Sequence, residues 1–242
     1  MINVRWLGHS CFELEGENKT VLFDPFKGTG LPEPSVKADI ILCSHSHADH
    51  NNAEPVMKRD SVVLEGFTGS KKIDDVIIKG VATFHDDTKG KARGNNSIYV
   101  MNMEDLSFCH LGDLGHDLTG TMLTEILFPL TTSGRSTKFL PCNASSSTAI
   151  PLGKVDVLFI PVGGFFTIDT TAVSRTVSAL KPKIVVPMHY RIVGMAPIFD
   201  PISGVDKFLD GKANVKKLDG PSFSVEKTTL PSEEIIIVPK LS

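Results

Sequence analysis

The chain has 242 residues, of which 41% are hydrophobic and 22% charged, and its formal net charge is −3 at pH 7. This ordinary composition lacks the basic excess of a general nucleic-acid or membrane binder, and no apolar run reaches the ~20 residues of a membrane span. The four cysteines form no CxxC pair, and the opening "MINVRWLGHS" lacks the regions of a signal peptide, so we expect reduced thiols in a cytoplasmic protein.

The first half of the chain predicts short β-strands separated by turn residues. The run "ADIILC", residues 38–43, is continuously apolar, as in a strand buried on both faces. The other expected strands cover residues 2–7, 11–15, 20–24, 62–66, 75–84, 97–102 and 106–112.

The second half alternates strands and helices. Residues 155–162 and 183–188 have the pattern of buried strands, and "TTAVSRTVSAL" at 170–180 has helical apolar spacing. A short helix is expected at 204–211, with closing strands at 222–227 and 234–239. Because both kinds of element run from end to end, the sequence predicts one α/β layered sandwich over residues 1–242.

The segment from about residue 118 to 152 departs from this pattern. It is rich in Ser and Thr and contains the nearly low-complexity run "NASSSTA". A long stretch without clear structure inside a compact domain is either functional or a tolerated surface insertion. We expect an inserted loop with one helical turn near "TMLTEIL", and the sequence leaves open whether it covers a site, mediates assembly or does neither.

The motif "SHSHADH" follows the apolar run "ADIILC" directly. It places His45, His47, Asp49 and His50 at the end of a buried strand, where α/β proteins position their sites. Imidazole and carboxylate suit zinc and similar metals, and a set rich in histidine favours a catalytic site with an open position over a closed structural site. The alternative, a polar surface turn, is disfavoured by the density of the pattern.

Three more potential ligands lie at strand ends further along the chain. His85 follows "GVATF", Asp113 follows "LSFCHLG", and His189 follows "KIVVPM". Taken alone, His85 and His189 could equally be hydrogen-bonded, half-buried histidines. Together with the first motif, the three residues predict two metal sites.

These motifs resemble those of the metallo-β-lactamase superfamily. "SHSHADH" is similar to its signature, "FHDD", "HLGDLGH" and "PMHY" follow in the order of its later ligand motifs, and "FDP" matches its first aspartate motif. Within it, "GHSCFELE", "NNSIYV" and "IPVGGFFTID" resemble the branch that contains ascorbate-6-phosphate lactonase-like hydrolases and N-acyl-phosphatidylethanolamine-hydrolysing phospholipase D.

The resemblance implies a four-layer αββα sandwich and a dinuclear metal centre. One ion would be held by His45, His47 and His85, the other by Asp49, His50 and His189, with Asp113 bridging them. Asp24 would accept a hydrogen bond that orients a ligand. Zinc is the first expectation for both divalent ions, and manganese or iron would also fit such ligands.

The expected activity is hydrolysis by a metal-activated water, with Asp49 as both ligand and proton acceptor. The expected partner is a small ester, lactone or phosphoester, with a sugar-acid or phosphorylated lactone as the leading example, and neither nucleic acid nor a membrane. A phosphodiesterase or nuclease of the same fold is one alternative, disfavoured by the lack of a basic balance. A non-catalytic metal-binding protein is another, disfavoured by the complete ligand set, and the sequence leaves open a homo-oligomer.

Four further residues are candidate substrate contacts: His9, His116, Arg93 and Arg191. A basic rim that includes the two arginines would suit a phosphorylated or carboxylated substrate. Each residue also has a structural interpretation, such as a histidine satisfied at a strand end or a solvated loop cation. Asp86 and Asp87 either support His85 or form a solvated turn, and His110 is expected to be packed in the core.

Overall fold

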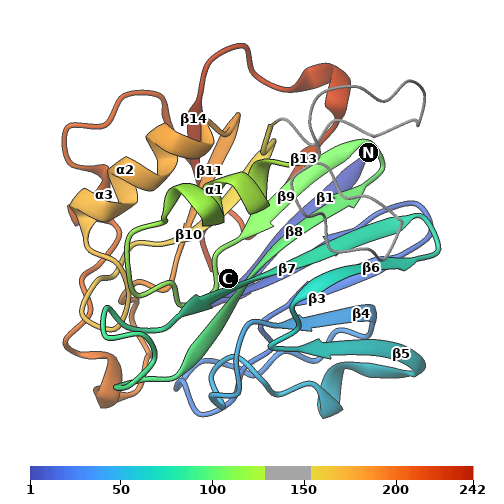
Figure 1. The fold of residues 1–242 in the computed structure, drawn as a ribbon, viewed down its shortest axis with the longest axis horizontal. Coiled ribbons are helices and arrows are strands. Elements are labelled where there is room, and N and C mark those ends of the chain that lie inside the picture. Colours follow the sequence, from blue (N-terminus) through green and yellow to red (C-terminus); the bar gives the residue numbers. More distant parts are fainter. Residues whose placement is uncertain (129–153, 242) are drawn as a thin grey trace.

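The structure, a computed structural model, describes residues 1–128 and 154–241. Two β-sheets are stacked face to face (Figure 1). One has six strands in the order β13-β1-β2-β3-β4-β5, and the other has eight in the order β12-β14-β11-β10-β9-β8-β7-β6. The α/β sandwich predicted from the sequence is confirmed.

The six-stranded sheet combines antiparallel and parallel pairs. Its strands are β1 (Ile2–Gly8), β2 (Cys11–Glu15), β3 (Thr20–Phe23), β4 (Ala38–Cys43), β5 (Met57–Glu65) and β13 (Ser222–Val225). β1 and β3 are both antiparallel to β2, and β3, β4 and β5 are mutually parallel. In β1 the alternate residues Ile2, Val4 and Trp6 enter the core between the sheets.

The eight-stranded sheet is antiparallel at one end and parallel at the other. Its strands are β6 (Gly69–Ile73), β7 (Val76–Phe84), β8 (Asn95–Met103), β9 (Leu106–His110), β10 (Val157–Pro161), β11 (Ile184–Met188), β12 (Val215–Lys217) and β14 (Ile235–Val238). β7 and β9 are both antiparallel to β8, and β9, β10 and β11 are parallel. Buried runs such as "VLFIP" and "IVVPM" suit parallel strands covered on both faces.

The helices in the described residues are α1 (Gly120–Leu127), α2 (Thr170–Leu180) and α3 (Asp206–Leu209), with 3₁₀ turns η1 (Glu54–Val56), η2 (Pro197–Phe199) and η3 (Lys227–Thr229). α1 and α2 lie beside each other against the eight-stranded sheet (Figure 1). α2 has the predicted bounds: the Asp169 side chain caps its first turn by accepting from the Ala172 N–H at 2.8 Å, and it ends at Lys181 in a left-handed conformation.

The outer face of the six-stranded sheet is covered differently. Leu22, Ile41 and Cys43 point away from the central core into a second apolar cluster, which also contains Phe26 and Phe199. Within the described ranges this cover consists of loops with the turns η1 and η2 rather than an α-helix. Loops around residues 26 and 199 are thereby held against the sheet edge that carries the site.

Two strands were not predicted, β6 and β12. Both lie at edges of the eight-stranded sheet. They carry the exposed lysines Lys71, Lys72, Lys216 and Lys217, which protect an edge against further pairing but remove the apolar alternation by which a strand is recognised.

The segment predicted as an insertion from about 118 begins as part of the sandwich. α1 is capped by the Thr119 hydroxyl, which accepts from the Met122 N–H, and it buries Ile126 while Leu123 and Leu127 pack on the core. The helical turn expected near "TMLTEIL" is present as α1, but it covers the sheet rather than lying in a loop outside the sandwich. Residues 129–152 of that prediction lie outside the described residues.

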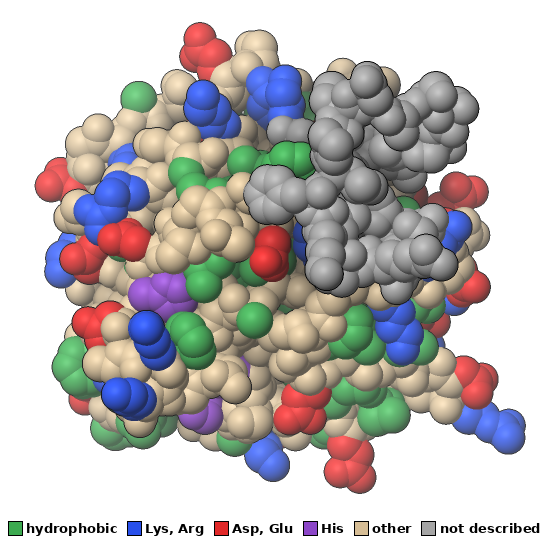
Figure 2. Space-filling view, in the orientation of Figure 1, with side chains coloured by type: hydrophobic (Ala, Val, Ile, Leu, Met, Phe, Trp, Pro, Cys, Tyr) green, Lys and Arg blue, Asp and Glu red, His purple; other side chains and the backbone are tan. Residues whose placement is uncertain are grey.

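The face of the molecule in Figure 2 carries side chains of both charges. No helix in the described part of the chain is long and apolar enough to cross a bilayer. In Figure 2 the Lys and Arg side chains are interspersed with Asp and Glu, without a block of one sign.

Candidate metal centre

The potential ligands gather at one edge of the sandwich because of strand direction. In the six-stranded sheet β1, β3 and β4 run in the same sense, and in the eight-stranded sheet so do β7, β9 and β11. The residues just beyond their carboxyl ends are His9, Asp24, His45 to His50, His85, Asp113 and His189. The prediction of sites at strand ends thus has a simple topological basis.

Three of these residues occupy a strained backbone conformation. His9, Asp24 and His189 have φ values of 52°, 42° and 51°. His and Asp enter the left-handed region more readily than most residues, but a non-glycine residue there still carries a steric cost. Such strain is retained where the surrounding structure needs a sharp turn. Here the chain turns sharply at each of these residues, just beyond the end of a strand.

The first group of potential ligands is His45, His47 and His85. One ring nitrogen of each lies within 4.8 Å of the others, and His45 Nε2 lies 3.0 Å from His47 Nδ1. His45 and His85 are buried, whereas His47 is exposed. This is the trio that the sequence assigned to one ion.

The second group is His9, Asp49, His50 and His189, whose ligand atoms also lie within 4.8 Å of one another. It contains the three residues assigned to the other ion, together with His9, which the sequence offered only as a substrate contact. His9 Nε2 lies 3.2 Å from Asp49 Oδ2 and 3.2 Å from His50 Nε2.

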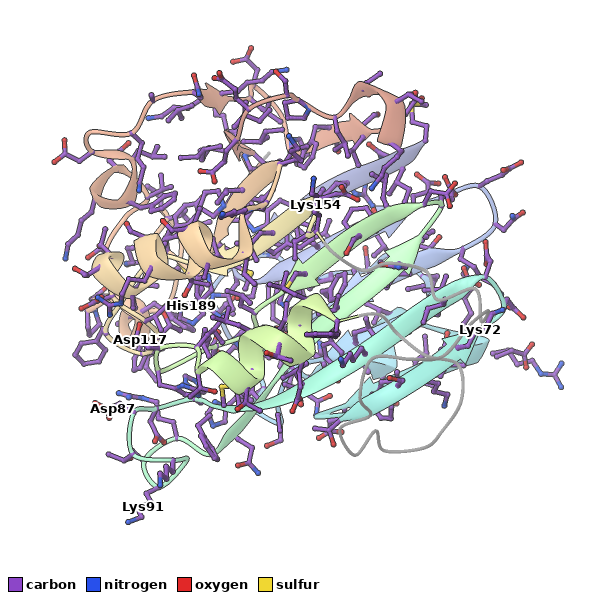
Figure 3. The ribbon with its side chains drawn as sticks, turned by 45° about the horizontal axis from the view of Figure 1, so that its top comes forward. Lys72, Asp87, Lys91, Asp117, Lys154 and His189 are labelled. Carbon is purple, nitrogen blue, oxygen red and sulfur yellow. The ribbon has the colours of Figure 1, made fainter. Side chains whose placement is uncertain are left out.

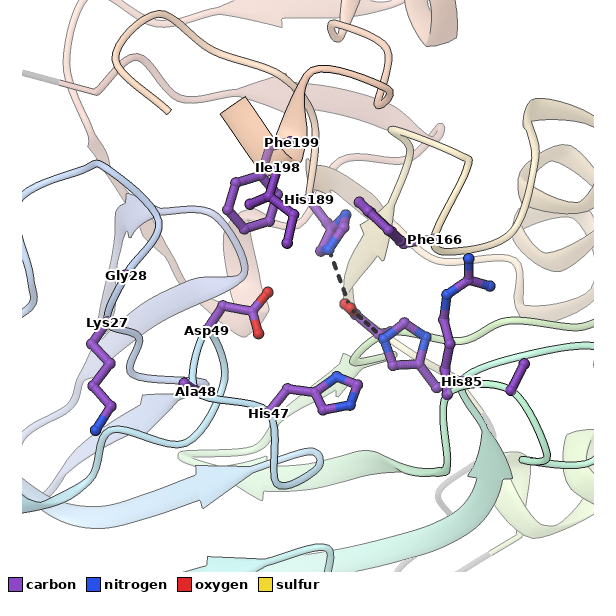
Figure 4. Close-up of a pocket in the computed structure, with 13 residues that line it drawn as sticks. Lys27, Gly28, His47, Ala48, Asp49, His85, Phe166, His189, Ile198 and Phe199 are labelled. Carbon is purple, nitrogen blue, oxygen red and sulfur yellow. Dashed lines mark ion pairs between the residues drawn. The ribbon is translucent and has the colours of Figure 1, made fainter. Parts of the chain in front are cut away.

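Asp113 connects the two groups. Its Oδ2 lies 3.1 Å from His85 Nε2, 3.2 Å from His50 Nε2 and 3.1 Å from His189 Nε2; Figure 4 marks the contacts to His85 and His189. Since His85 belongs to one group and the other two histidines to the second, Asp113 occupies the position expected of a bridging ligand.

Asn96, which the sequence reasoning did not assign, holds Asp113 in place. Its Oδ1 accepts from the Asp113 N–H at 2.9 Å, while its amide donates to Thr83 Oγ1 at 2.8 Å and to the Leu111 carbonyl at 3.0 Å. The motif "NNSIYV" was the only signal, and it indicated a family resemblance rather than this contact.

Asp24 orients ligands of both groups. Its Oδ2 accepts from His50 Nδ1 and from the Ser44 hydroxyl, each at 2.8 Å, and its Oδ1 accepts from the Ser44 N–H at 2.7 Å. Because the Ser44 hydroxyl donates to Asp24, it accepts from His45 Nδ1 at 2.9 Å. Both imidazoles are thereby fixed with the Nε2 lone pair directed into the site.

The ionisation of the cluster follows from its burial and its mixed charges. Burial lowers the pKa of His45 to about 3 and, with nearby His189, that of His9 to about 4. Although burial opposes it, the carboxylates of Asp113 and Asp49 raise the pKa of His50 well above its usual range. The surrounding histidines, His50 prominent among them, lower the pKa of both carboxyls despite their burial. His45, His9 and the two carboxylates are thus already in the forms that bind a metal, whereas His50 must lose a proton to do so.

The donor set fits divalent cations. Asp113 Oδ1 and the Nδ1 atoms of His9, His85 and His189 are buried without a hydrogen-bond partner among the described residues. The Nε2 atoms of His50, His85 and His189 converge on Asp113 Oδ2, an arrangement that a cation between them would stabilise. Imidazole and carboxylate ligands of this kind suit zinc, manganese or iron.

A cleft of about 470 Å³ opens above this cluster. Its floor includes His47, Asp49, His85 and His189, and Phe166, Ile198 and Phe199 form an apolar wall (Figure 4). Lys27 and Arg93 also line it. The size and the mixture of apolar wall and few polar groups suit a small molecule.

The loop that carries Arg93 is organised by Asp86. The Asp86 carboxylate accepts hydrogen bonds from the N–H groups of Thr88, Gly90, Ala92 and Arg93, at distances from 2.8 to 3.0 Å, and from the Thr88 hydroxyl. The Arg93 guanidinium lies 5.4 Å from the centre of the Phe166 ring, a cation–π contact. Of the two interpretations of Asp86, the structure favours a supporting residue.

Two candidate substrate contacts lie outside the lining of the cleft. Arg191 donates to the carbonyls of Ile192 and Met195 and pairs with Asp200 at 2.7 Å, so it braces its own loop. His116 Nε2 accepts from the Phe84 N–H at 3.1 Å, which fixes the end of β7. His110 is packed in the core, as predicted, where it stacks on Phe23 with ring centres 4.9 Å apart.

A family model of the β-lactamase superfamily domain matches residues 3–129 and 125–189 of this chain. The chain belongs to the metallo-β-lactamase superfamily. A metal-dependent hydrolase of Thermococcus onnurineus is 30% identical over 78% of this chain and 85% of its own length, and one of Pyrococcus horikoshii is 29% identical over the same shares. The chain is thus a member of the metal-dependent hydrolases of this superfamily, which confirms the coarser part of the prediction.

Solved structures agree with this assignment. A Thermotoga maritima protein, described as a Zn-dependent hydrolase of the superfamily, is 30% identical over the whole of both chains with a TM-score of 0.75. CmlA, a diiron β-hydroxylase of Streptomyces venezuelae, shares the fold at 14% identity and a TM-score of 0.54, over 78% of this chain and 44% of its own.

Asp24→Asn should weaken metal binding in both groups, because its amide would face Ser44 and His50 with a donor where a shared acceptor is needed. We expect a loss of about 10- to 100-fold in affinity, the usual scale for residues that orient metal ligands. Competition with a chromophoric chelator measures it. Asp39→Asn is the control, since Asp39 accepts from the Thr20 N–H at the far end of β4. Unchanged affinity in Asp24→Asn would show that Asp24 has no role in orienting the ligands.

Proposed function

We propose that this chain hydrolyses a small ester, lactone or phosphoester with two divalent ions, zinc by preference, bound by the two ligand groups. The observation that carries the proposal is the position of Asp113, whose Oδ2 reaches histidines of both groups beneath an open cleft. The Zn-dependent description of the Thermotoga maritima protein supports zinc, while the diiron CmlA is a reason to test iron as well.

The chemistry divides between the ions and the side chains. When bound, the ions supply a nucleophilic water at neutral pH and polarise the scissile carbonyl or phosphoryl oxygen. Asp49 lies at the cleft, with a quarter of its side chain exposed (26%), and is ionised because its pKa is lowered. It can therefore hold the water and accept its proton. Asp24 and Asn96 keep the histidines and Asp113 in fixed positions while the charge at the reacting centre changes.

The lining of the cleft suggests the shape of the substrate. Arg93 offers a guanidinium within reach of the floor, and its backbone N–H is held by Asp86. The cleft also has apolar surface, which is supplied by Phe166, Ile198 and Phe199. A substrate with a carboxylate or phosphate beside a hydrolysable bond fits both features, and a sugar-acid or phosphorylated lactone is the leading example.

The proposal is tested first by activity. Metal-loaded protein should hydrolyse at least one of a set of lactones, carboxylic esters, thioesters and phosphodiesters, and lose that activity after exhaustive chelation. Asp49→Asn should lower kcat on the substrate found by about 10² or more, the scale of general acid–base catalysis. Metal content is measured on the same preparations, so that loss of metal and loss of the base are separated.

Asp87→Asn is the matched control for this variant. Asp87 is an exposed acid beside His85 and points away from the molecule (Figure 3). Near-native kcat in fully loaded Asp49→Asn would overturn the role of Asp49. No hydrolysis of any ester, lactone or phosphoester by loaded wild-type protein, with activity on single-stranded or duplex nucleic acid instead, would favour the nuclease alternative.

Arg93→Ala should discriminate between substrates by charge. A charge-assisted hydrogen bond contributes about 1.5–3 kcal/mol, so kcat/KM for an anionic substrate should fall by roughly 10- to 100-fold. A neutral ester of similar size should lose little. Lys91→Ala is the control, because Lys91 is an exposed cation of the same loop that points outward (Figure 3). Equal losses on anionic and neutral substrates would show that Arg93 acts only through the structure of its loop.

A further inference from the structure

His9 lies inside the second ligand group although it precedes the histidine motif by 36 residues or more. It occupies the turn between β1 and β2 and is only 1% exposed. Its carbonyl accepts from the Trp6 indole N–H at 3.1 Å and from the His189 N–H at 3.2 Å. These hydrogen bonds and the left-handed φ of 52° fix the backbone of His9, and thereby the position from which its side chain extends.

The His9 ring has both apolar and polar neighbours, and the polar ones belong to the second ligand group. Phe199 and Phe26 meet the His9 ring edge-on, with centroid distances of 5.1 Å and 6.3 Å. Its Nε2 faces Asp49 and His50, and the ring centre lies 4.4 Å from that of His189.

Three distances within the group lie within about 0.1 Å of those expected between ligands of one ion. Two donors each about 2.0–2.2 Å from a tetrahedral ion lie about 3.3–3.6 Å apart. His9 Nε2 is 3.2 Å from both Asp49 Oδ2 and His50 Nε2, and those two atoms are 3.7 Å apart. His9 therefore completes a ring of donors that is already spaced for a shared cation.

A hydrogen bond from His9 to Asp49 is the competing explanation of the same distance. In that case His9 Nε2 would donate its proton to Asp49 Oδ2 or to the His50 Nε2 lone pair, and the glutamine variant below separates this from metal binding. His9 also shares one feature with His85 and His189: in all three Nδ1 is buried without a partner among the described residues, so Nε2 is the polar atom that the cluster engages. His9 thus has the surroundings of the assigned ligands.

We propose that His9 is a metal ligand, a donor to the ion held by Asp49, His50 and His189 in addition to the bridging Asp113. The inference rests on the dinuclear site of the proposed function. With His9 included, this group has no exposed histidine, whereas the other group ends in the exposed His47. The ion at His45, His47 and His85 is then the one with room for exchangeable water and substrate.

The test measures metal binding directly. Wild-type, His9→Phe, His9→Gln and His116→Gln proteins are stripped of metal and titrated with Zn²⁺ against a chromophoric chelator, and with Co²⁺ while the visible absorption spectrum is recorded. We expect His9→Phe and His9→Gln to bind one ion as wild type does and the second about 10- to 100-fold more weakly, with an altered cobalt spectrum. His116→Gln, outside the cleft, should match wild type.

The possible results separate the claims. Failure of wild-type protein to bind two ions would overturn the proposed function. Two ions in wild type, with wild-type affinities and spectrum in His9→Phe, would overturn the role of His9 alone. Recovery of both in His9→Gln but not in His9→Phe would also overturn it, since Gln can still donate to Asp49.

A measurement on the unaltered protein covers the case in which the variants do not fold. Protein labelled with ¹⁵N at histidine is loaded with an NMR-active cadmium isotope. Scalar coupling between cadmium and His9 Nε2 is the expected result. Coupling to the histidines of the motif without coupling to His9 would overturn the proposal.

Discussion

The metal centre depends on one buried carboxylate, that of Asp24, and on the turn that places it. Asp24 lies fully buried just after β3, beside the end of the parallel strand β4, where it accepts three hydrogen bonds from Ser44 and His50. Through the Ser44 hydroxyl it also orients His45. Burying an ionised group is costly unless it is fully paired, and here every bond from the protein to Asp24 also positions a ligand or its neighbour. The hydrogen bonds that offset the cost of burying Asp24 therefore also pre-organise the site.

The two sheets contribute in complementary ways. The six-stranded sheet supplies Asp24, His9 and the histidine motif, and the eight-stranded sheet supplies His85, Asp113 and His189. The site exists only where the sheets are stacked, and Asp113 Oδ2 contacts histidines from both. Tyr99 strengthens this junction, because its hydroxyl on β8 lies 3.0 Å from the carbonyl of Cys43, the last residue of β4. Bound ions would cross-link the sheets at the same edge, so metal affinity and folding stability are coupled.

Much of this could be predicted from the sequence, and the failures have physical causes. Apolar runs located the buried strands, and a dense polar motif at a strand end located the site. Polar edge strands such as β6 gave no apolar signal. The Ser/Thr-rich context of α1 concealed that this helix, expected as a single turn in a loop, packs on the core. Asn96 acts through contacts between segments far apart in the chain, which no local pattern encodes. The same kind of contact places His9, expected from the sequence as a substrate contact, inside the second ligand group. Arg191 was misjudged because its nearness to His189 in sequence does not determine that its side chain turns back onto its own loop.

The central claim is that this edge of the sandwich binds two divalent ions. The most direct measurement is elemental analysis of wild-type protein purified without chelator, repeated after reconstitution with Zn²⁺, Mn²⁺ or Fe²⁺ and removal of free metal. The account predicts a content that approaches two transition-metal ions per chain for at least one of the metals. A reproducible content near zero, or saturation at a single ion with every metal, would contradict it.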